Sequence, residues 1–290
     1  MIFFPHAKIN IGLQVLRKRE DGFHDLSLSF VPLWDLHDIL EIIPAEKDSF
    51  KVINCSDMPA LGSGHTDNLV VKARDLLRRY ADIPPCAIYL YKHIPIGAGL
   101  GGGSSDCAYT LHGLNKVFSL GFSIDELQNH VRLLGSDCAF FLENGKRIAN
   151  GRGDYFTAFE RCTPANIYDV VVIKPSFSIS TAEAYESVIP DANRPSLTEF
   201  LRLPLEQWRN NIENDFEKFL REKYPQIEEI KNELYEKGAL YASLSGSGSA
   251  IYGIFEHGCS PRFNAAITAD ATSAIPALAG CRIFYCFLEI

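Results

Sequence analysis

The sequence predicts an α+β fold for this chain of 290 residues. Three observations support that class. Segments typical of strands and of helices are mixed along the chain and do not alternate strictly, which disfavours a doubly wound sheet. Apolar residues make up 47% of the sequence, and no low-complexity tract interrupts it, so the chain is expected to be globular throughout. Its length is sufficient for one large or two modest domains with their own cores.

A break between two halves is expected near residues 157–169, ahead of the strand pattern "VVVIKP". We therefore predict a first domain at residues 1–158 and a second at 159–290. In the second half, helices are expected at Thr181–Ser187 and at Pro225–Glu236. Gly238 follows the latter helix at the C′ position, where glycine is favoured.

The most informative stretch is "PIGAGLGGGSSD", residues 95–106. Residues 86–94 before it are rich in β-branched and aromatic side chains and predict a strand. Residues 104–118 after it place apolar side chains at helical spacing. Ser104 or Ser105 is predicted as the N-cap of that helix, with Asp106 in its first turn.

Glycines between a strand and a helix start favour an anion site over a flexible linker. The first N–H groups of a helix have no partner within the helix, and glycines leave neighbouring loop N–H groups accessible. Holding such a loop in one conformation costs entropy, which a bound ligand can offset. The segment is therefore predicted to bind phosphate.

Other glycine motifs fit this stretch less well. The Walker pattern fails because no lysine follows the glycines. The dinucleotide pattern G-x-G-x-x-G matches at Gly97, Gly99 and Gly102, but Lys92, His93 and Pro95 separate it from the apolar strand. The acids about twenty residues further on begin a helix in "SIDELQNHVRLLG", which carries a capping box of Ser and Glu. A nucleophile elbow G-x-S-x-G is absent from the chain.

Composition narrows the class of partner. The formal net charge of −8 disfavours nucleic-acid binding. The opening apolar run is too short for a signal peptide or membrane helix. The eight cysteines form no C-x-x-C pair, and several lie in apolar patterns, so they are expected to be reduced core residues. We expect a cytoplasmic protein with a small-molecule substrate, without nucleic-acid or membrane partners, that is a monomer or a weak homodimer.

Two charged residues stand out near other motifs. Lys8 lies in a strand-like alternation, where Lys8, Asn10, Gly12 and Gln14 share a polar face opposite an apolar one. Taken alone, a lysine in this position is usually a solvated charge. Asp137 lies in "LGSDCAFFL", and on its own it is interpreted as a turn or cap aspartate.

Several segments, in order, resemble the GHMP kinases, the family of galactokinase and of homoserine, mevalonate and phosphomevalonate kinases. The phosphate-binding stretch resembles the family's P-x-x-x-G-L-G-S-S loop, and "LSGSGSAIYGIF" near the C-terminus resembles its third, glycine-rich motif. The segments "PHAKINIGLQVLRKREDGFHDLSLSF", "TDNLVVKA", "LGSDCAFFL" and "GRGD", together with the long GLGGGSS form, are similar to one member of the family. The resemblance is densest over residues 5–158 and recurs at 172–185, 211–216 and 243–250.

The resemblance implies an N-terminal ATP-binding lobe and a C-terminal substrate lobe, with the active site between them. It implies ATP as co-substrate, with Mg²⁺ as the ATP chelate, and phosphorylation of the 2-hydroxyl of a cytidine diphosphate-linked methylerythritol in the non-mevalonate route to isoprenoids. Lys8 and Asp137 are the implied catalytic pair, with Asp137 as the base. The implied ATP-binding loop consists of Pro95, Ile96, Gly97, Ala98, Gly99, Leu100, Gly101, Gly102, Gly103, Ser104 and Ser105.

The implied acceptor site combines polar contacts with aromatic faces that stack on cytosine. Its residues are Asn10, Phe23, His24, Phe30, Thr181 and Tyr185. The sequence departs from the family at Phe23, where tyrosine is usual, and at Ala139, where proline is usual. Another GHMP kinase, a dinucleotide-dependent oxidoreductase and a non-catalytic nucleotide-binding module are the alternatives that the sequence leaves open.

Overall fold

A computed structural model describes residues 1–54, 67–143, 145–159, 166–258, 278 and 280–290. These residues form two compact units that interleave along the chain. The first unit comprises Met1–Ala7, Leu36–Ile96 and Gly101–Gly145, and the second comprises Lys8–Asp35, Gly97–Leu100 and Lys146–Ile290. The expected break near residues 157–169 lies partly outside the described residues, and the division at residue 158 stays a proposal.

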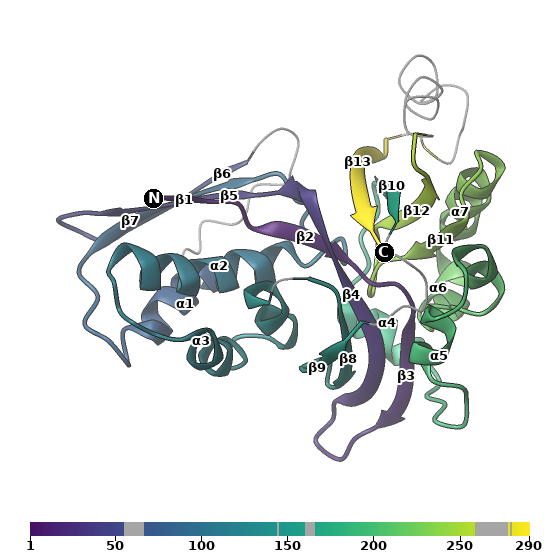
Figure 1. The fold of residues 1–290 in the computed structure, drawn as a ribbon, viewed down its shortest axis with the longest axis horizontal. Coiled ribbons are helices and arrows are strands. Elements are labelled where there is room, and N and C mark those ends of the chain that lie inside the picture. The colour runs from purple at the N-terminus through teal and green to yellow at the C-terminus, as the bar shows by residue number, and fades with distance from the viewer. Residues whose placement is uncertain (55–66, 144, 160–165, 259–277, 279) are drawn as a thin grey trace. The chain divides into compact units, whose positions relative to one another are not determined.

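The first unit is a sheet with helices against one side (Figure 1). Its strands follow the order β1-β5-β7-β6, in which β6 runs parallel to β7 and the other pairs are antiparallel. The elements are β1 (Ile2–Phe3), β5 (Ile39–Pro44), β6 (Ser49–Asn54), β7 (Cys86–Lys92), α1 (Leu69–Leu77), α2 (Gly102–Val117), α3 (Ile124–Val131) and the 3₁₀ helix η2 (Ser136–Leu142).

Helix α2 packs closely on this sheet. A Cβ at Gly113 would lie 2.7 Å from Ile42 Cδ1 and 2.9 Å from Phe3, so only glycine permits that approach. The predicted strand at residues 86–94 and the predicted helix after the glycines are both confirmed, as is the capping box of α3, where Ser123 and Glu126 cap each other.

The second unit holds an antiparallel sheet of order β11-β12-β10-β13 and most of the strands that pair around β4, which spans His24–His37. The end of β4, from Leu36, and the start of β2, up to Ala7, belong to the first unit. Strand β4 pairs with β3 and β8, and β8 pairs with β9. The other elements are β2 (His6–Ile9), β3 (Leu13–Lys18), β8 (Arg147–Gly151), β9 (Tyr155–Ala158), β10 (Ile167–Lys174), α4 (Thr181–Ser187), α5 (Leu197–Leu201), η3 (Leu205–Asn210), α6 (Glu217–Lys223), α7 (Gln226–Glu236), β11 (Tyr241–Leu244), β12 (Ile251–Glu256) and β13 (Arg282–Glu289).

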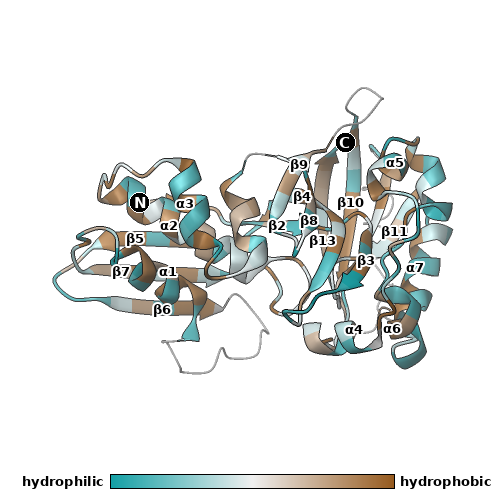
Figure 2. Cartoon of the chain, turned by 90° about the horizontal axis from the view of Figure 1, so that it is seen from below, coloured by the Kyte–Doolittle hydropathy of each residue, from teal (hydrophilic) through white to brown (hydrophobic). Residues whose placement is uncertain are grey.

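Helix α7 covers the β11–β12 part of that sheet with one apolar face. Its side chains Ile227, Ile230 and Leu234 are buried, while its other face is hydrophilic (Figure 2). The helix ends as predicted, with Gly238 at C′ and a φ of +96°. The predicted helix at Thr181–Ser187 is confirmed as α4.

The polar face that carries Lys8 differs from the expectation of a solvated surface. The expected continuous strand is interrupted between Ile9, the end of β2, and Leu13, the start of β3. Within this interruption Gly12 adopts a φ of +72° and lies against Leu197 and Ile212. Lys8, Asn10 and Gln14 are all buried, because Leu197 of α5 and Tyr252 of β12 lie against this part of the chain.

None of the described helices has the length and apolar character needed to cross a membrane. The cysteines that are described, at positions 86, 107, 138, 281 and 286, are all free thiols.

Candidate active site

The glycine-rich loop is divided between the two units, with Gly97–Leu100 in the second and the flanking residues in the first. Gly97, Gly99 and Gly101 all have φ between +62° and +74°, a conformation that strongly favours glycine. At Gly97 the space around a Cβ is open. At Gly99 a Cβ would lie 1.9 Å from the carbonyl oxygen of Ser245. The glycines thus serve two purposes, an open side and a close backbone contact.

The start of helix α2 corrects one sequence prediction. The N-cap is Gly101 in the left-handed conformation, without a side-chain cap, and the helix begins at Gly102. Ser104 and Ser105 consequently lie inside the helix and do not cap it. Ser105 is fully buried, whereas Ser104 is half-buried and Gly103 is exposed. The accessible part of this helix end is therefore formed by Gly103 and Ser104.

Lys8 is directed onto the loop within the second unit. Its Nζ donates to the carbonyl oxygen of Gly99 at 2.8 Å and to Oδ1 of Asn10 at 2.5 Å. The Lys8 backbone N–H also donates to Leu100 O at 3.0 Å. Only 3% of Lys8 is exposed, so this ammonium is a fixed charge beside the loop and its position is well defined.

The third glycine-rich segment completes this cluster. We call Leu244–Ser249, which starts at the last residue of β11 and leads toward β12, the third-motif loop. Ser245 Oγ donates to Gly99 O at 2.9 Å and accepts from the Asn10 N–H at 3.3 Å. The Ala250 N–H donates to Ala98 O at 3.0 Å. Three segments that are distant in sequence therefore converge on Gly99 within one unit.

Asp137 lies in the first unit, in the first turn of η2. It is half-buried, and the residue after it, Cys138, packs among α2 side chains. Hydrogen bonds with Cys107 and Ser104 hold the pKa of the Cys138 thiol below its usual value. The turn that carries Asp137 is thereby joined to the accessible end of α2. Lys8 and Asp137 lie in different units, and their pairing stays a proposal.

Among the predicted acceptor residues, His24 and Tyr185 come together. Their rings stack with centroids 4.8 Å apart and planes inclined by 21°. Burial, with a smaller effect of Lys18, lowers the pKa of His24, so its ring is neutral at neutral pH and offers both a donor and an acceptor. Thr181 is exposed at the start of α4, with its hydroxyl 3.3 Å from that of Ser247 in the third-motif loop.

Phe23 and Phe30 differ in accessibility. Phe23 is 51% exposed, and the Arg152 guanidinium lies 4.4 Å from its ring centre. Phe30 is fully buried against Phe156, with Lys8 Nζ 5.3 Å from its ring centre. A buried ring packs and offers no free face, which favours a supporting role for Phe30 behind Lys8 over direct stacking on a base.

A buried polar cluster beside the start of the loop was not predicted from the sequence. Lys92 at the end of β7 forms an ion pair with Asp38 and donates a hydrogen bond of 2.7 Å to Asp106 of α2. Asp38 also accepts the N–H groups of His93 and Ile94 at 2.6 and 2.9 Å. These bonds fix the residues that enter the glycine-rich loop. The sequence signal for this cluster was the presence of Lys92 in a strand pattern and Asp106 in a helix pattern.

Comparisons with known proteins identify the class to which this chain belongs. GHMP kinases N terminal domain matches residues 68–145, and GHMP kinases C terminal matches residues 188–262. These matches lie on either side of the proposed division at residue 158. The chain is a kinase of the GHMP class.

Relatives define the family more closely. A 4-diphosphocytidyl-2-C-methyl-D-erythritol kinase of Azobacteroides pseudotrichonymphae is 45% identical over 88% of this chain and 94% of its own length. One from Bacteroides fragilis is 46% identical over 88% and 92%. A crystal structure of 4-(cytidine 5'-diphospho)-2C-methyl-D-erythritol kinase matches all of both chains at 28% identity with a TM-score of 0.78. The chain belongs to the 4-diphosphocytidyl-2-C-methyl-D-erythritol kinase family.

More distant structures share the fold alone. The mevalonate kinase of Methanococcus jannaschii is 15% identical, with a TM-score of 0.69 over 99% of this chain. The homoserine kinase of Cytophaga hutchinsonii is 17% identical, with a TM-score of 0.65 over 97%.

Proposed function

We propose that this chain transfers the γ-phosphoryl group of ATP to the 2-hydroxyl of 4-diphosphocytidyl-2-C-methyl-D-erythritol, giving the 2-phosphate and ADP. The observation that carries the proposal is the identity of 45–46% to kinases of that name over 88% of the chain. The product would enter isoprenoid precursor synthesis by the non-mevalonate route.

Phosphoryl transfer requires that the phosphates are held, their charge is offset and the acceptor hydroxyl is aligned. The loop from Pro95 to Ser105 supplies backbone N–H groups and the α2 N-terminus for the first task. The open side at Gly97 and the exposure of Gly103 leave room for phosphates to approach. ATP is expected as its Mg²⁺ chelate, since Mg²⁺ in such sites is held largely by phosphates and water.

Lys8 and Asp137 are the proposed catalytic residues. Lys8 offsets negative charge as the γ-phosphoryl group moves, because its ammonium is fixed beside Gly99. Asp137 orients the acceptor hydroxyl and takes its proton late, since a carboxylate is too weak a base to deprotonate an alcohol at the outset. The proton leaves the 2-hydroxyl as the new oxygen–phosphorus bond forms and the bond to ADP breaks.

His24 and Tyr185 are proposed to hold the cytosine ring, with Phe23 at the exposed edge. Their stacked geometry supports this role, because a base can extend an existing stack at about 1–3 kcal/mol for each aromatic contact. Asn10 and Thr181 are proposed polar contacts to the acceptor. We further propose that the protein is cytoplasmic, is a monomer or a weak homodimer, and has no nucleic-acid or membrane partner. The net charge of −8 supports the absence of a nucleic-acid partner.

The proposal is tested by measuring ADP release from Mg-ATP by the purified chain. The acceptor panel is 4-diphosphocytidyl-2-C-methyl-D-erythritol, mevalonate, homoserine and galactose, each at the same concentration. Turnover with the cytidylyl acceptor alone is expected. Turnover with another acceptor would retain the GHMP class and refute the proposed acceptor site, and silence with all four would refute the proposed activity.

A further inference from the structure

The segment Glu213–Glu217 follows η3 and ends at the first residue of α6. The side chain of Asn214 is buried, and those of Asp215 and Glu217 are partly buried. Asn214 is 2% exposed. The carboxylate of Asp215 makes a paired bond with Arg194 and accepts the Val15 N–H at 2.7 Å. Leu13 and the segment also exchange backbone hydrogen bonds through Glu213 O and the Asp215 N–H. The segment is therefore tied to strand β3, which follows directly from Lys8 and Asn10 along the chain.

The side-chain amide of Asn214 binds the backbone of the third-motif loop. Its Nδ2 donates to Leu244 O at 2.9 Å and to Gly246 O at 2.8 Å, and its Oδ1 accepts the Phe216 N–H at 3.1 Å. Both amide hydrogens are thus used on carbonyls that flank Ser245. Asparagine has the two donors and one acceptor that this arrangement requires.

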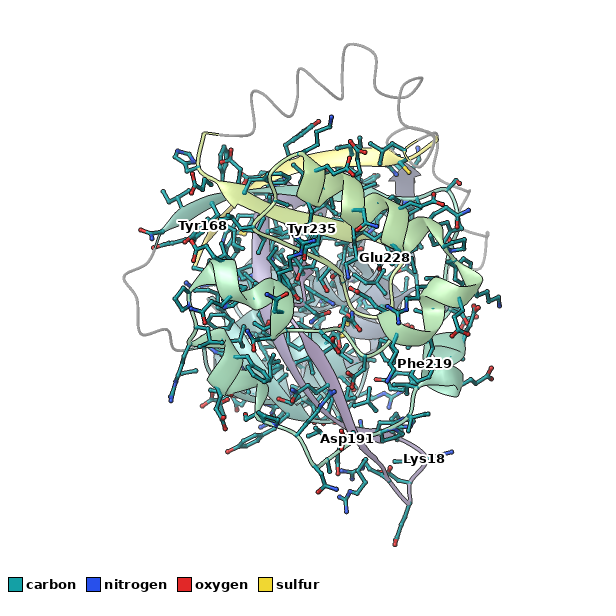
Figure 3. The ribbon with its side chains drawn as sticks, turned by 90° about the vertical axis from the view of Figure 1, so that its right-hand side faces the viewer. Lys18, Tyr168, Asp191, Phe219, Glu228 and Tyr235 are labelled. Atoms are coloured by element: carbon teal, nitrogen blue, oxygen red, sulfur yellow. The ribbon has the colours of Figure 1, made fainter. Side chains whose placement is uncertain are left out.

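Glu217 holds the residues that enter the same loop. One carboxylate oxygen accepts from Ser243 Oγ at 2.8 Å and from the Leu244 N–H at 2.5 Å, and the other is paired with Lys231. A polar cavity of about 280 Å³ lies beside these side chains, and most of its lining residues are charged or polar. Helix α7, which bears the labelled Tyr235 and Glu228, supplies part of that lining (Figure 3). Hydrogen bonds from Asn214 and Glu217 therefore hold the loop from this side.

The loop that Asn214 holds is the one that contacts the proposed catalytic cluster. Ser245, between the two carbonyls, donates to Gly99 O, the same oxygen that accepts from Lys8. The Cβ position of Gly246 lies 3.1 Å from Asn10 Oδ1 and 3.5 Å from Lys8 Nζ. A shift of the loop would move Ser245 off Gly99 and open the space beside the Lys8 ammonium.

We propose that Asn214, supported by Glu217, is a positioning residue for phosphoryl transfer. Asn214 binds the carbonyl oxygens on both sides of Ser245 and so keeps the Ser245 hydroxyl hydrogen-bonded to Gly99 O. Because Lys8 Nζ donates to the same Gly99 oxygen, its position also stays fixed during phosphoryl transfer. The inference rests on the proposed function of the Lys8 cluster, and it extends that function to a residue acting through Ser245.

The test is Asn214→Asp, which preserves size and removes both N–H donors. A carboxylate facing two carbonyls repels them, and displacement of a catalytic cluster by about 1 Å can cost roughly 100-fold in rate. We expect kcat to fall by about that factor, with KM for the cytidylyl acceptor changed much less. Asn211→Asp is the matched control, because Asn211 caps the end of η3, three residues before Asn214, and its amide donates to Gln207 O in an exposed hydrogen bond. Its kcat should equal that of the wild type.

A pH profile separates positioning from a general loss of structure. A protonated carboxyl has one O–H donor and can restore one of the two bonds, and burial favours the protonated form. The ratio of wild-type kcat to Asn214→Asp kcat should therefore shrink as pH falls from 8 to 6. A purely structural defect would leave that ratio unchanged, and this outcome would overturn the proposal.

Ser245→Ala provides a second variant that leaves the backbone intact if Asn214→Asp does not fold. It should lower kcat, and where both variants fold the double variant should lose less than the product of the two single effects, because both act through one contact. Wild-type kcat in Ser245→Ala, or in folded Asn214→Asp, would overturn the proposal. Silence of the wild type with every acceptor would instead be a failure of the proposed function, so the two failures are distinguishable.

Discussion

Ser245 and Gly99 lie 146 positions apart in the sequence, yet the Ser245 hydroxyl donates a hydrogen bond of 2.9 Å to the Gly99 carbonyl oxygen. The same oxygen accepts from Lys8 at 2.8 Å. The carbonyl oxygen of Gly99, in the glycine-rich loop, therefore binds both the third-motif loop and Lys8. Glycine at position 99 makes this possible, because no side chain fits between its Cα and Ser245.

The first prediction compares two glycines of this loop. Gly99→Ala should abolish measurable turnover, since its Cβ would lie 1.9 Å from Ser245 O. Gly97→Ala has the same left-handed backbone but open space around its Cβ. It should lose about 1–2 kcal/mol of stability from backbone strain and retain measurable turnover with a raised KM for ATP, because its methyl group narrows the open side proposed for the phosphates. Thermal unfolding and ADP release measure the two effects. Equal activity of the two variants would contradict the contact as described.

The second prediction concerns the proposed catalytic lysine. Lys8→Met keeps the apolar stem and removes the ammonium, and kcat should fall by about 100- to 1,000-fold. The dissociation constant for ATP, measured by direct binding, should change only a few-fold, because loop N–H groups hold the phosphates. Lys51→Met is the control, since Lys51 is exposed on β6 and the proposed site does not include it. Near-normal turnover of Lys8→Met would remove Lys8 from the catalytic assignment.

Asp137 is tested by an isosteric change. Asp137→Asn keeps the half-buried turn of η2 and removes the proton acceptor, which should lower kcat by about 100- to 10,000-fold. ATP affinity should again be retained. Cys138 offers a check on the turn itself, because Cys138→Ser preserves its hydrogen bonding and should leave kcat within a few-fold of the wild type. A large loss in both variants would show that the turn is fragile and that the effect is not chemical.

Local signals predicted the elements around the site, and distant contacts account for what they missed. The strand before the glycines, the capped helix α3 and the Gly238 end of α7 each follow from a few neighbouring residues. The alternation around Lys8 predicted a polar face but not its burial. The residues that bury it come from elements far along the chain, because Leu197 of α5 packs on Gly12 and Tyr252 of β12 donates to Asn10 O. Ser104 and Ser105 were predicted as caps because serine favours that position, yet the N-cap is Gly101 in its left-handed conformation and the helix begins at Gly102.

The roles of Asn214 and Ser245 were also beyond the sequence pattern. Both lie in segments that resemble the family, but no periodicity connects them. Their relationship depends on one amide that reaches two carbonyls on a loop 30 residues further along. Side-chain hydrogen bonds of this kind leave no regular spacing in a sequence.

The fourth prediction concerns recognition of the acceptor. Tyr185→Leu removes the ring that stacks on His24, and the KM for the cytidylyl acceptor should rise by about tenfold to hundredfold, as expected for one lost stacking contact. The KM for ATP should stay the same. Tyr168→Leu on β10 is the control, with no expected effect on either constant (Figure 3). An unchanged acceptor KM in Tyr185→Leu would exclude the His24–Tyr185 pair from the cytosine site.

The last prediction concerns Asp106, which is buried beside Lys92 at the base of the glycine-rich loop. One of its oxygens accepts from Lys92, and the other has no hydrogen-bond partner among the described residues. Burial outweighs the attraction of Lys92 and raises the pKa of Asp106 to about 8. The native state therefore holds a proton that the unfolded chain, with its ordinary aspartate pKa near 4, releases.

Between about pH 4 and pH 8 the native state binds more protons than the unfolded state through this group, so its contribution to stability falls as pH rises. The slope is at most about 1.4 kcal/mol per pH unit. Asp106→Asn removes the titration, and the free energy of unfolding of the wild type minus that of the variant should decrease from pH 4 to pH 8. Asp125→Asn, at an exposed position on α3, should give a difference without that trend. A difference that stays constant for Asp106→Asn would mean that this carboxyl titrates alike in both states, and that Lys92 fully compensates its burial.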